Sequence, residues 1–268
     1  MLITKFIFQQ KYTLTKLPLK EQFIFTLIRL RRNPSIVMLS DLFCISIGTG
    51  SRIFITWLLF LSKELLFLLP FTTTADLDGI LKPKELRAIE NLRAIIDCTE
   101  FHIQKPSKIS SQRSTHSQYK STNTFKLLVS ISPIAHFNYV SKLFTGSISD
   151  KEIVKESGFL DLLEPGDVAM ADKGFNIQDL LALRETKLLA PPLMRRENLS
   201  AGMSTATRRI AKVRVHVERM IRKLKCFTIL KGPLPLTMKP YVDAVITVCA
   251  ALVNLQPSVI QDHEYTDN

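Results

Sequence analysis

The stretch STATRRIAKVRVHVERMIRKLK, residues 204–225, carries eight bases and a single acid. Its apolar residues recur every three or four positions, which predicts an amphipathic helix with one buried stripe. Glu218 falls at the margin of that stripe, where a helix packed on a sheet can direct a carboxylate toward the sheet edge. An ordinary surface helix with i,i+4 ion pairs is the alternative interpretation.

The overall composition is that of a globular protein with an anionic partner. Hydrophobic residues make up 46% of the 268 residues and charged residues 22%, which excludes an intrinsically disordered chain. The net charge of +12 favours nucleic acid or an anionic membrane surface as that partner. The four cysteines form no CxxC pair, so neither a structural zinc site nor a disulfide framework is expected.

One apolar run, residues 53–71, has the length of a membrane span. Lys63 and Glu64 lie inside it, and each charge would cost about 2.5–3.5 kcal/mol at a bilayer centre. The run therefore predicts a buried amphipathic helix with its charges in solvent, and no membrane partner. The first residues lack a sustained apolar run followed by a cleavage site, so no signal peptide is expected.

Composition and periodicity divide the chain into five segments. Residues 21–75 have a helical pattern and residues 92–256 interleave short apolar strands with helices, which is typical of an α/β domain with a mixed sheet. The other three are a poorly ordered N-terminal segment, a linker and a tail, over residues 1–20, 76–91 and 257–268.

The helical segment has the outline of a helix-turn-helix. A short helix over 41–44, capped by Ser40, precedes a turn at 45–48 and a longer helix capped by Thr49 or Ser51. An all-helical packing domain is the alternative, since any helical hairpin has this outline.

Two aspartates follow directly on short apolar strands: Asp97 on LRAII and Asp172 on VAMA. If these strands are parallel neighbours, both carboxylates emerge at the carboxyl edge of the sheet, where α/β folds place ligands. A single aspartate in this context is more often a turn or capping residue, so the prediction depends on both aspartates meeting Glu218. Three such oxygen donors suit Mg²⁺ or Mn²⁺, and two ions of this kind can promote phosphodiester cleavage.

Acidic residues are absent from residues 101–149, although bases are frequent there. A surface that follows phosphates would exclude carboxylates in this way, because each one repels the ligand. The side chains expected to bind DNA are basic and come from this segment and from the predicted helix: Lys120, Lys126, Arg208, Lys212, Arg214, Arg219, Arg222 and Lys223.

The motifs IIDCTEF, SDKEI, GDVAMADKGF, the pair Pro191-Pro192 and RRIAKVRVHVERMIRKLK resemble, in this order, the DDE-superfamily endonuclease domain of eukaryotic transposases. The resemblance is to the Harbinger-like and THAP-associated type and covers about residues 92–255. The preceding LPLKEQFIFTLIRLRRNPSIVMLSDLF resembles the helical segment that often precedes this domain.

This resemblance implies an RNase H-like fold and cut-and-paste DNA transposition in the nucleus, with two Mg²⁺ or Mn²⁺ ions. The catalytic triad falls on Asp97, Asp172 and Glu218. A domesticated or inactive transposase that binds DNA without cutting it remains the alternative. The sequence shows no THAP-type zinc module, so the specific recognition of DNA ends is expected from the helix-turn-helix, from a separate partner protein or from a region outside this chain. Association into a homo-oligomer is also compatible with the resemblance.

Asp150, in SDKEI, resembles another position typical of the family. Ser149 and Asp150 precede a helix predicted over 150–157, and we interpret Asp150 as a helix cap rather than a ligand. Glu100 and Asp167 are interpreted as local turn or strand-end residues.

Overall fold

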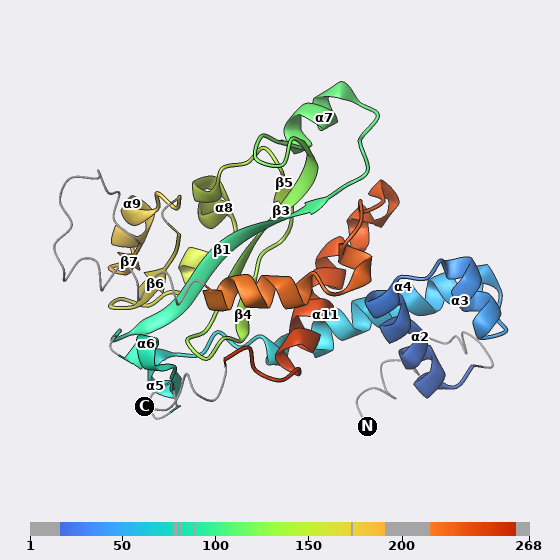
Figure 1. The fold of residues 1–268 in the computed structure, drawn as a ribbon, viewed down its shortest axis with the longest axis horizontal. Coiled ribbons are helices and arrows are strands. Elements are labelled where there is room, and N and C mark those ends of the chain that lie inside the picture. Colours follow the sequence, from blue (N-terminus) through green and yellow to red (C-terminus); the bar gives the residue numbers. More distant parts are fainter. Residues whose placement is uncertain are drawn as a thin grey trace.

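The computed structural model describes residues 17–77, 80, 82–87, 89–172, 174–190 and 215–260. In these residues, helices precede a mixed sheet in the strand order β2-β3-β1-β6-β7, with β4 and β5 paired to β3 (Figure 1). The architecture confirms the predicted class, an RNase H-like α/β fold with a helical N-terminal region.

The described part of the N-terminal region, from residue 17 on, contains three helices: α2 (Leu19–Arg32), α3 (Ile36–Leu42) and α4 (Ile47–Glu64). Asn33 ends α2 in the left-handed conformation, with φ of 52°. Ser35 then accepts a hydrogen bond from the Met38 amide at 3.1 Å and begins α3. Ser46 accepts one from the Thr49 amide at 3.2 Å and begins α4.

The predicted caps of these helices are therefore wrong. Ser40 is buried inside α3, and Thr49 and Ser51 lie inside α4. The reason is that Ser35 and Ser46 lie earlier in each helical run and already supply the capping oxygen. The order of short helix, turn and longer helix is nevertheless the predicted one.

Helices α3 and α4 are bent by 101° relative to each other and meet at Gly50. A Cβ at this position would lie 2.3 Å from Ser40 Oγ and 3.1 Å from the Phe25 ring. Only glycine allows the helices to approach this closely, so Gly50 fixes the angle of the helix-turn-helix.

The apolar run that resembles a membrane span is broken in the structure. Helix α4 ends at Glu64, with Lys63 and Glu64 exposed as predicted, and a 3-10 turn, η1 (Leu66–Leu68), follows. The stretch Leu236–Asn254 also has the length and composition of a span. It consists of η4 (Leu236–Tyr241), with Pro240 inside, and α11 (Val242–Asn254), whose buried residues contribute to the core. We interpret both as core helices.

Strand β1 (Leu92–His102) is the centre of the sheet. It pairs antiparallel with β3 (Thr122–Ile131) on one side and parallel with β6 (Val168–Met170) on the other. Strands β3 and β4 (Phe137–Val140) pair antiparallel and form a hairpin. The remaining strands are short: β2 (His116–Ser117), β5 (Phe144–Thr145) and β7 (Lys187–Leu189).

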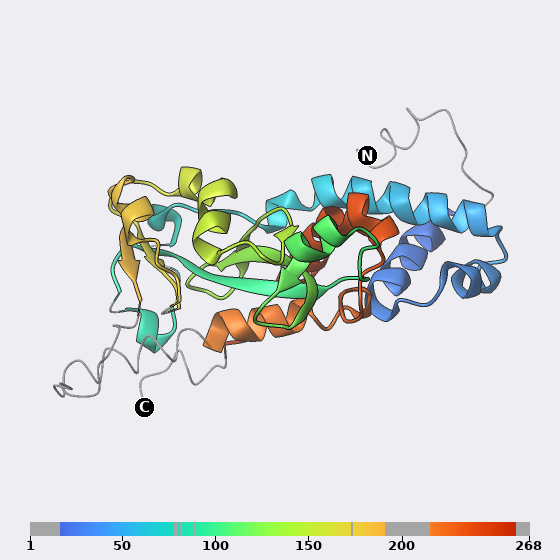
Figure 2. The ribbon, with the colours of Figure 1, turned by 90° about the horizontal axis from the view of Figure 1, so that it is seen from above.

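Each face of the sheet has its own apolar core. One core includes residues of α4, α11 and the helix over residues 215–224, and Figure 2 shows this last helix on the opposite side of β1 from α8 (Asp150–Glu156). The other face packs against α8, η2 (Phe159–Leu162) and α9 (Gln178–Ala182). We call these the basic-helix face and the α8 face.

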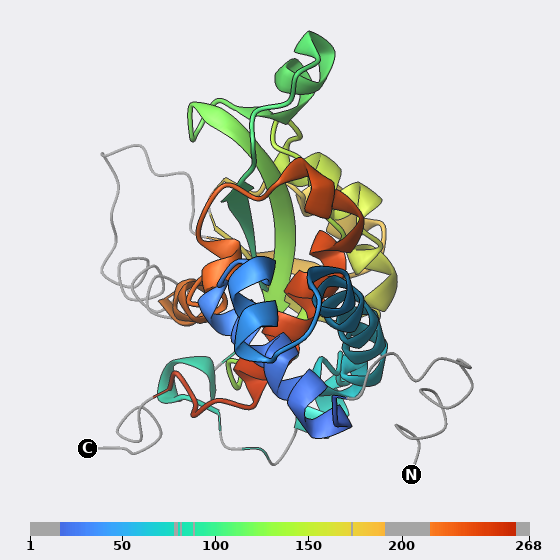
Figure 3. The same cartoon turned by 90° about the vertical axis from the view of Figure 1, so that its right-hand side faces the viewer.

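Four short elements complete the described chain: α5 (Thr74–Leu77), α6 (Lys84–Arg87), α7 (Ile109–Thr115) and η3 (Thr228–Leu230). Helix α7 projects from the end of the sheet (Figures 1 and 3). Helix α6 lies in the predicted linker, where Leu77 and Leu86 are buried. The predicted domain boundaries stay predictions.

Candidate active site

The two aspartates lie at matching positions beside the open edge of β1. The last parallel pair between β1 and β6 is Ile95 with Met170, and Asp97 and Asp172 are each two residues further along. The prediction that the two strands are parallel neighbours is thus confirmed, since β1 pairs parallel with β6. Beyond this point β6 has ended, and among the described residues β1 pairs only with β3.

Asp97 does not follow a short strand, contrary to the prediction. Strand β1 continues to His102, because β3 pairs with it as far as the partners His102 and Thr124. Asp97 therefore lies inside a long strand, opposite Val129. A carboxylate held by a paired strand has a more fixed backbone than one in a loop.

Side-chain alternation places both aspartates on the basic-helix face. Ile95 and Phe101 point into the core on that face, and Asp97 has the same parity along β1. Asp172 has the same parity as Met170, which belongs to the same core. Cys98, in contrast, packs against the core on the α8 face.

Asp97 and Asp172 line one cavity of about 510 Å³, together with Asp150, Lys126 and Lys225. The cavity lies around the open edge of β1 and so receives side chains from both faces of the sheet. Crevices at the carboxyl ends of strands are the usual ligand sites of α/β folds.

Asp150 lines the cavity, but it is not the helix cap that the sequence predicts. Ser149 caps α8 by accepting a hydrogen bond from the Glu152 amide at 3.1 Å. Asp150 is the first residue of α8 and forms an ion pair with Lys126 at 2.6 Å. Burial, followed by the Asp150 charge, raises the pKa of the neighbouring Cys98 thiol. Asp150 thus has a structural partner on the α8 face.

Lys225 is a site residue that the sequence interpretation missed. Its Nζ donates to the Glu100 carbonyl at 3.1 Å and lies 5.4 Å from the centre of the Phe101 ring. Burial, and then the charge of Lys120, lowers the pKa of Lys225, against an opposite effect of Asp97 and Glu100. Helical periodicity could have found it, because Lys225 lies two turns after Glu218.

Glu218 is exposed on the helix over 215–224 and is not among the residues that line the cavity. At 100° per residue, seven positions return to almost the same side, so Glu218 and Lys225 share one flank of this helix. The helix and β1 run in the same direction (Figures 1 and 2).

Two helical turns span about 10.5 Å, and three strand residues span about 10 Å. Since Lys225 contacts Glu100, the position two turns earlier on the helix corresponds to Asp97 on the strand. We therefore expect the Glu218 side chain to face Asp97 from across the cavity edge.

Among the described residues, no group of three or more histidine, cysteine or carboxylate side chains is arranged to hold a metal ion. Asp97 and Asp172 nevertheless supply carboxylate oxygens to one cavity, and such donors suit Mg²⁺ or Mn²⁺. The expected third donor, Glu218, would approach from the helix. The two aspartates therefore fit the predicted ions. Glu218 is the expected third ligand and does not line the cavity.

The predicted DNA-binding bases that the structure describes separate into three groups. Lys120 and Lys126 line the cavity, and Arg222 is exposed on the helix over 215–224. Arg219 donates to the Val259 carbonyl at 3.2 Å and Lys223 to the Pro257 carbonyl, so both contact the C-terminal segment on the other flank. The others lie outside the described residues, as does the Pro191-Pro192 pair: Arg208, Lys212 and Arg214.

Comparison with known families agrees with this geometry. Residues 96–254 match the family model of the DDE superfamily endonuclease. The chain belongs to this family. Residues 15–67 of the chain match the helix-turn-helix of DDE superfamily endonucleases, which confirms the helix-turn-helix over the alternative of a packing domain. A search among curated proteins finds no match.

All three predicted acids of this endonuclease lie within the matched residues. Family membership supports an endonuclease that is derived from a transposase and binds DNA. The Harbinger-like subtype stays a prediction.

Proposed function

We propose that the chain is a metal-dependent DNA endonuclease of the transposase type, which cleaves phosphodiester bonds and joins strands. One observation carries the proposal: Asp97 and Asp172 occupy matching positions at one sheet edge, on the face covered by the basic helix. Membership in the DDE superfamily endonucleases supplies the reaction class. Because the substrate is DNA and the resemblance is to eukaryotic transposases, we place its action in the nucleus.

In this proposal the carboxylate oxygens of Asp97, Asp172 and Glu218 hold Mg²⁺ or Mn²⁺. Two bound ions would supply an activated water or 3′-hydroxyl and neutralise charge on the leaving oxygen.

 The ligands are thus carboxylates, while the surrounding bases contact the DNA.

The basic side chains position the strand in this proposal. The Lys225 ammonium group lies at the cavity beside Glu100 and Asp97, where it can donate to an oxygen of the phosphate that is cut. Lys120 is exposed at the same cavity and adds a second positive charge. The helix-turn-helix holds the duplex through the start of α4, which is where such motifs contact DNA.

Nicking of a supercoiled plasmid tests this function. The parent chain should convert the plasmid to open circles in Mg²⁺ or Mn²⁺ and not in a chelator. Asp97→Asn, Asp172→Asn and Glu218→Gln should each lower the rate by at least about a hundredfold, since a catalytic ion contributes several kcal/mol to the transition state. Glu156→Gln, which changes an exposed carboxylate on α8, is the matched control and should cut like the parent.

Two outcomes would contradict the proposal. If the three variants cut as fast as the parent, the assignment of these acids is wrong. If the parent binds duplex DNA but nicks it in neither metal, the chain is instead a DNA-binding protein without nuclease activity.

A further inference from the structure

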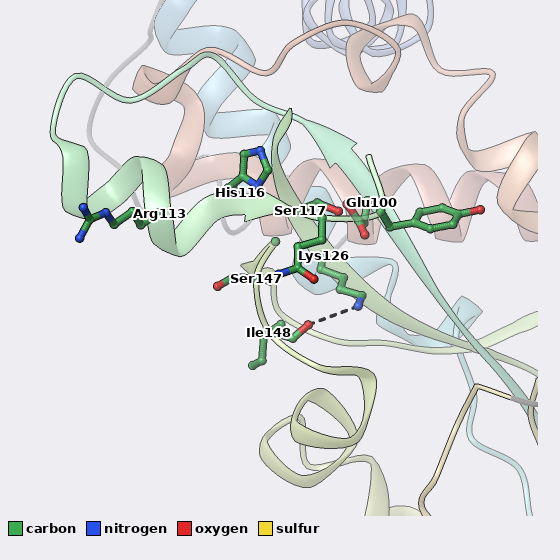
Figure 4. A pocket seen from close by; sticks show the side chains of 10 residues that line it. Glu100, Arg113, His116, Ser117, Lys126, Ser147 and Ile148 are labelled. Atoms are coloured by element: carbon green, nitrogen blue, oxygen red, sulfur yellow. Dashed lines mark hydrogen bonds between the residues drawn. The ribbon is translucent and has the colours of Figure 1, made fainter. Parts of the chain in front are cut away.

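A second hollow of about 510 Å³ adjoins the cavity that holds Asp97 and Asp172. The two share Glu100, Tyr119 and Lys126, so they form one continuous depression. Figure 4 shows Lys126 directed toward the Ile148 carbonyl, with Arg113 on α7 at the opposite rim. A strand whose phosphate lies at the aspartates can therefore continue into this second hollow.

Hydrogen bonds fix the segments that surround the second hollow. Asn123 donates to the Gln112 carbonyl and to Thr115 Oγ1, both at 2.8 Å, and so fixes α7 to β3. The Ser147 hydroxyl donates to the Ser114 carbonyl at 2.6 Å. A Cβ at Gly146 would lie 2.2 Å from a Thr124 oxygen, so the floor is also closely packed. The hollow is preformed.

The rim of the second hollow combines an exposed aromatic ring with positive charge. Tyr119 is 84% exposed, in the turn between β2 and β3, and the Lys120 Nζ lies 4.7 Å from its ring centre. Arg113 and His116 are also exposed there. Glu100 is the one acid among the described lining residues, and its carboxylate accepts a hydrogen bond from Thr124 at 2.8 Å.

An exposed aromatic ring beside basic side chains is the combination that binds unpaired nucleotides, because every base has a face that can stack. The volume lies within the range of about 300–1,000 Å³ that is typical of small-ligand pockets, which a single nucleotide fits.

We propose that the second hollow binds the unpaired nucleotide next to the phosphate that is cut, with the base stacked on Tyr119 and the backbone phosphate bound by Arg113. This inference rests on the proposed function, which places the cut phosphate at the aspartates. It assigns Tyr119 and Arg113 to substrate binding, a role that the sequence interpretation gave to neither.

Fluorescence of a new tryptophan tests the stacking directly. The chain has a single tryptophan, Trp57, which is only 6% exposed, so Tyr119→Trp adds an accessible reporter. A single-stranded oligothymidylate of about fifteen nucleotides should quench its fluorescence. Phe67→Trp is the matched control, because Phe67 is 73% exposed on η1, and it should not be quenched. If anisotropy shows that the oligonucleotide binds the Tyr119→Trp variant, but the tryptophan fluorescence is not quenched, the proposal is wrong.

Affinities separate this proposal from the nuclease proposal. Tyr119→Ala should weaken binding of the same oligonucleotide about tenfold, and Tyr119→Phe, which keeps the ring, should change it less than about twofold. If the parent nicks plasmid but Tyr119→Ala binds like the parent, the nucleotide site is wrong and the nuclease stands. If quenching occurs but no metal supports nicking, the nuclease proposal fails and the nucleotide site stands.

Discussion

At the scale of single residues, neighbouring side chains in β1 have different environments because alternate residues face opposite sides of the sheet. Asp97 lies on the basic-helix face, and Cys98 lies on the α8 face near Asp150 and Lys126. The ion pair of Asp150 with Lys126 therefore belongs to the packing of α8. Asp150, Lys126 and Lys225 nevertheless all line the cavity of the aspartates.

The half-buried Cys98 and the buried Cys249 give a first prediction. Burial raises the pKa of the Cys98 and Cys249 thiols, so both stay protonated at a pH where exposed thiols begin to ionise. At about pH 8, iodoacetamide should alkylate the exposed Cys44 and Cys226 at least about tenfold faster, as measured by peptide mass spectrometry. Labelling in urea should remove the difference. Equal rates in the native protein would contradict the burial of Cys98.

The lowered pKa of Lys225 gives a second prediction. Burial lowers this pKa below its ordinary value of 10.5, so the ammonium group loses its proton earlier than other lysines as the pH rises. DNA affinity should therefore begin to fall at a lower pH than that, about 10.4, at which ordinary lysines lose their protons. Lys225→Arg keeps the charge and should remove the fall. Fluorescence anisotropy at several pH values measures the effect, and an identical pH dependence in both proteins would contradict it.

At the scale of elements, the sequence predicts which strands and helices exist better than where they end. The β3–β4 hairpin and the parallel strands before the aspartates follow from local apolar runs. The extension of β1 to His102 does not, because it depends on pairing with β3, which lies far along the chain. Several hydroxyl residues match the pattern of a cap near α4, and only the packed structure selects Ser46.

The cap of α4 gives a third prediction. Ser46→Ala removes the hydrogen bond to the Thr49 amide and should lower the free energy of unfolding by about 0.5–2 kcal/mol. Ser51→Ala, in the same helix, removes no capping bond and should change it by less than about 0.5 kcal/mol. Urea denaturation followed by circular dichroism measures both. If Ser51→Ala lowers the free energy of unfolding more than Ser46→Ala does, Ser51 is the cap of α4, as the sequence predicts.

At the scale of the whole molecule, the helix-turn-helix lies at one end and strands β6 and β7 at the other (Figure 1). That the two aspartates line one cavity was predictable, because each lies in a recognisable motif, IIDCTEF or GDVAMADKGF. Lys225 and Asp150 were not assigned to the cavity, because their positions depend on how a helix and a sheet from distant parts of the sequence pack together. The net charge of +12 acts over this whole surface.

This charge gives a fourth prediction. The logarithm of the DNA dissociation constant should rise linearly with the logarithm of salt concentration, since each neutralised phosphate releases counterions. With about four phosphate contacts, affinity should fall about a hundredfold between 50 and 200 mM salt. For single-stranded DNA, Arg113→Gln should reduce the slope of this logarithmic plot by about 0.7, because one phosphate contact is lost. A slope near zero would contradict binding through the basic surface.

The most direct test of the central claim is Mn²⁺ binding followed by electron paramagnetic resonance, which requires no cleavage. Free Mn²⁺ gives a signal that binding suppresses, so titration yields an affinity for each protein. We expect Asp97→Asn, Asp172→Asn and Glu218→Gln each to weaken Mn²⁺ binding by at least about tenfold, while Glu156→Gln should bind like the parent. Parent-like binding by Glu218→Gln would contradict the claim that the helix over 215–224 completes the metal site.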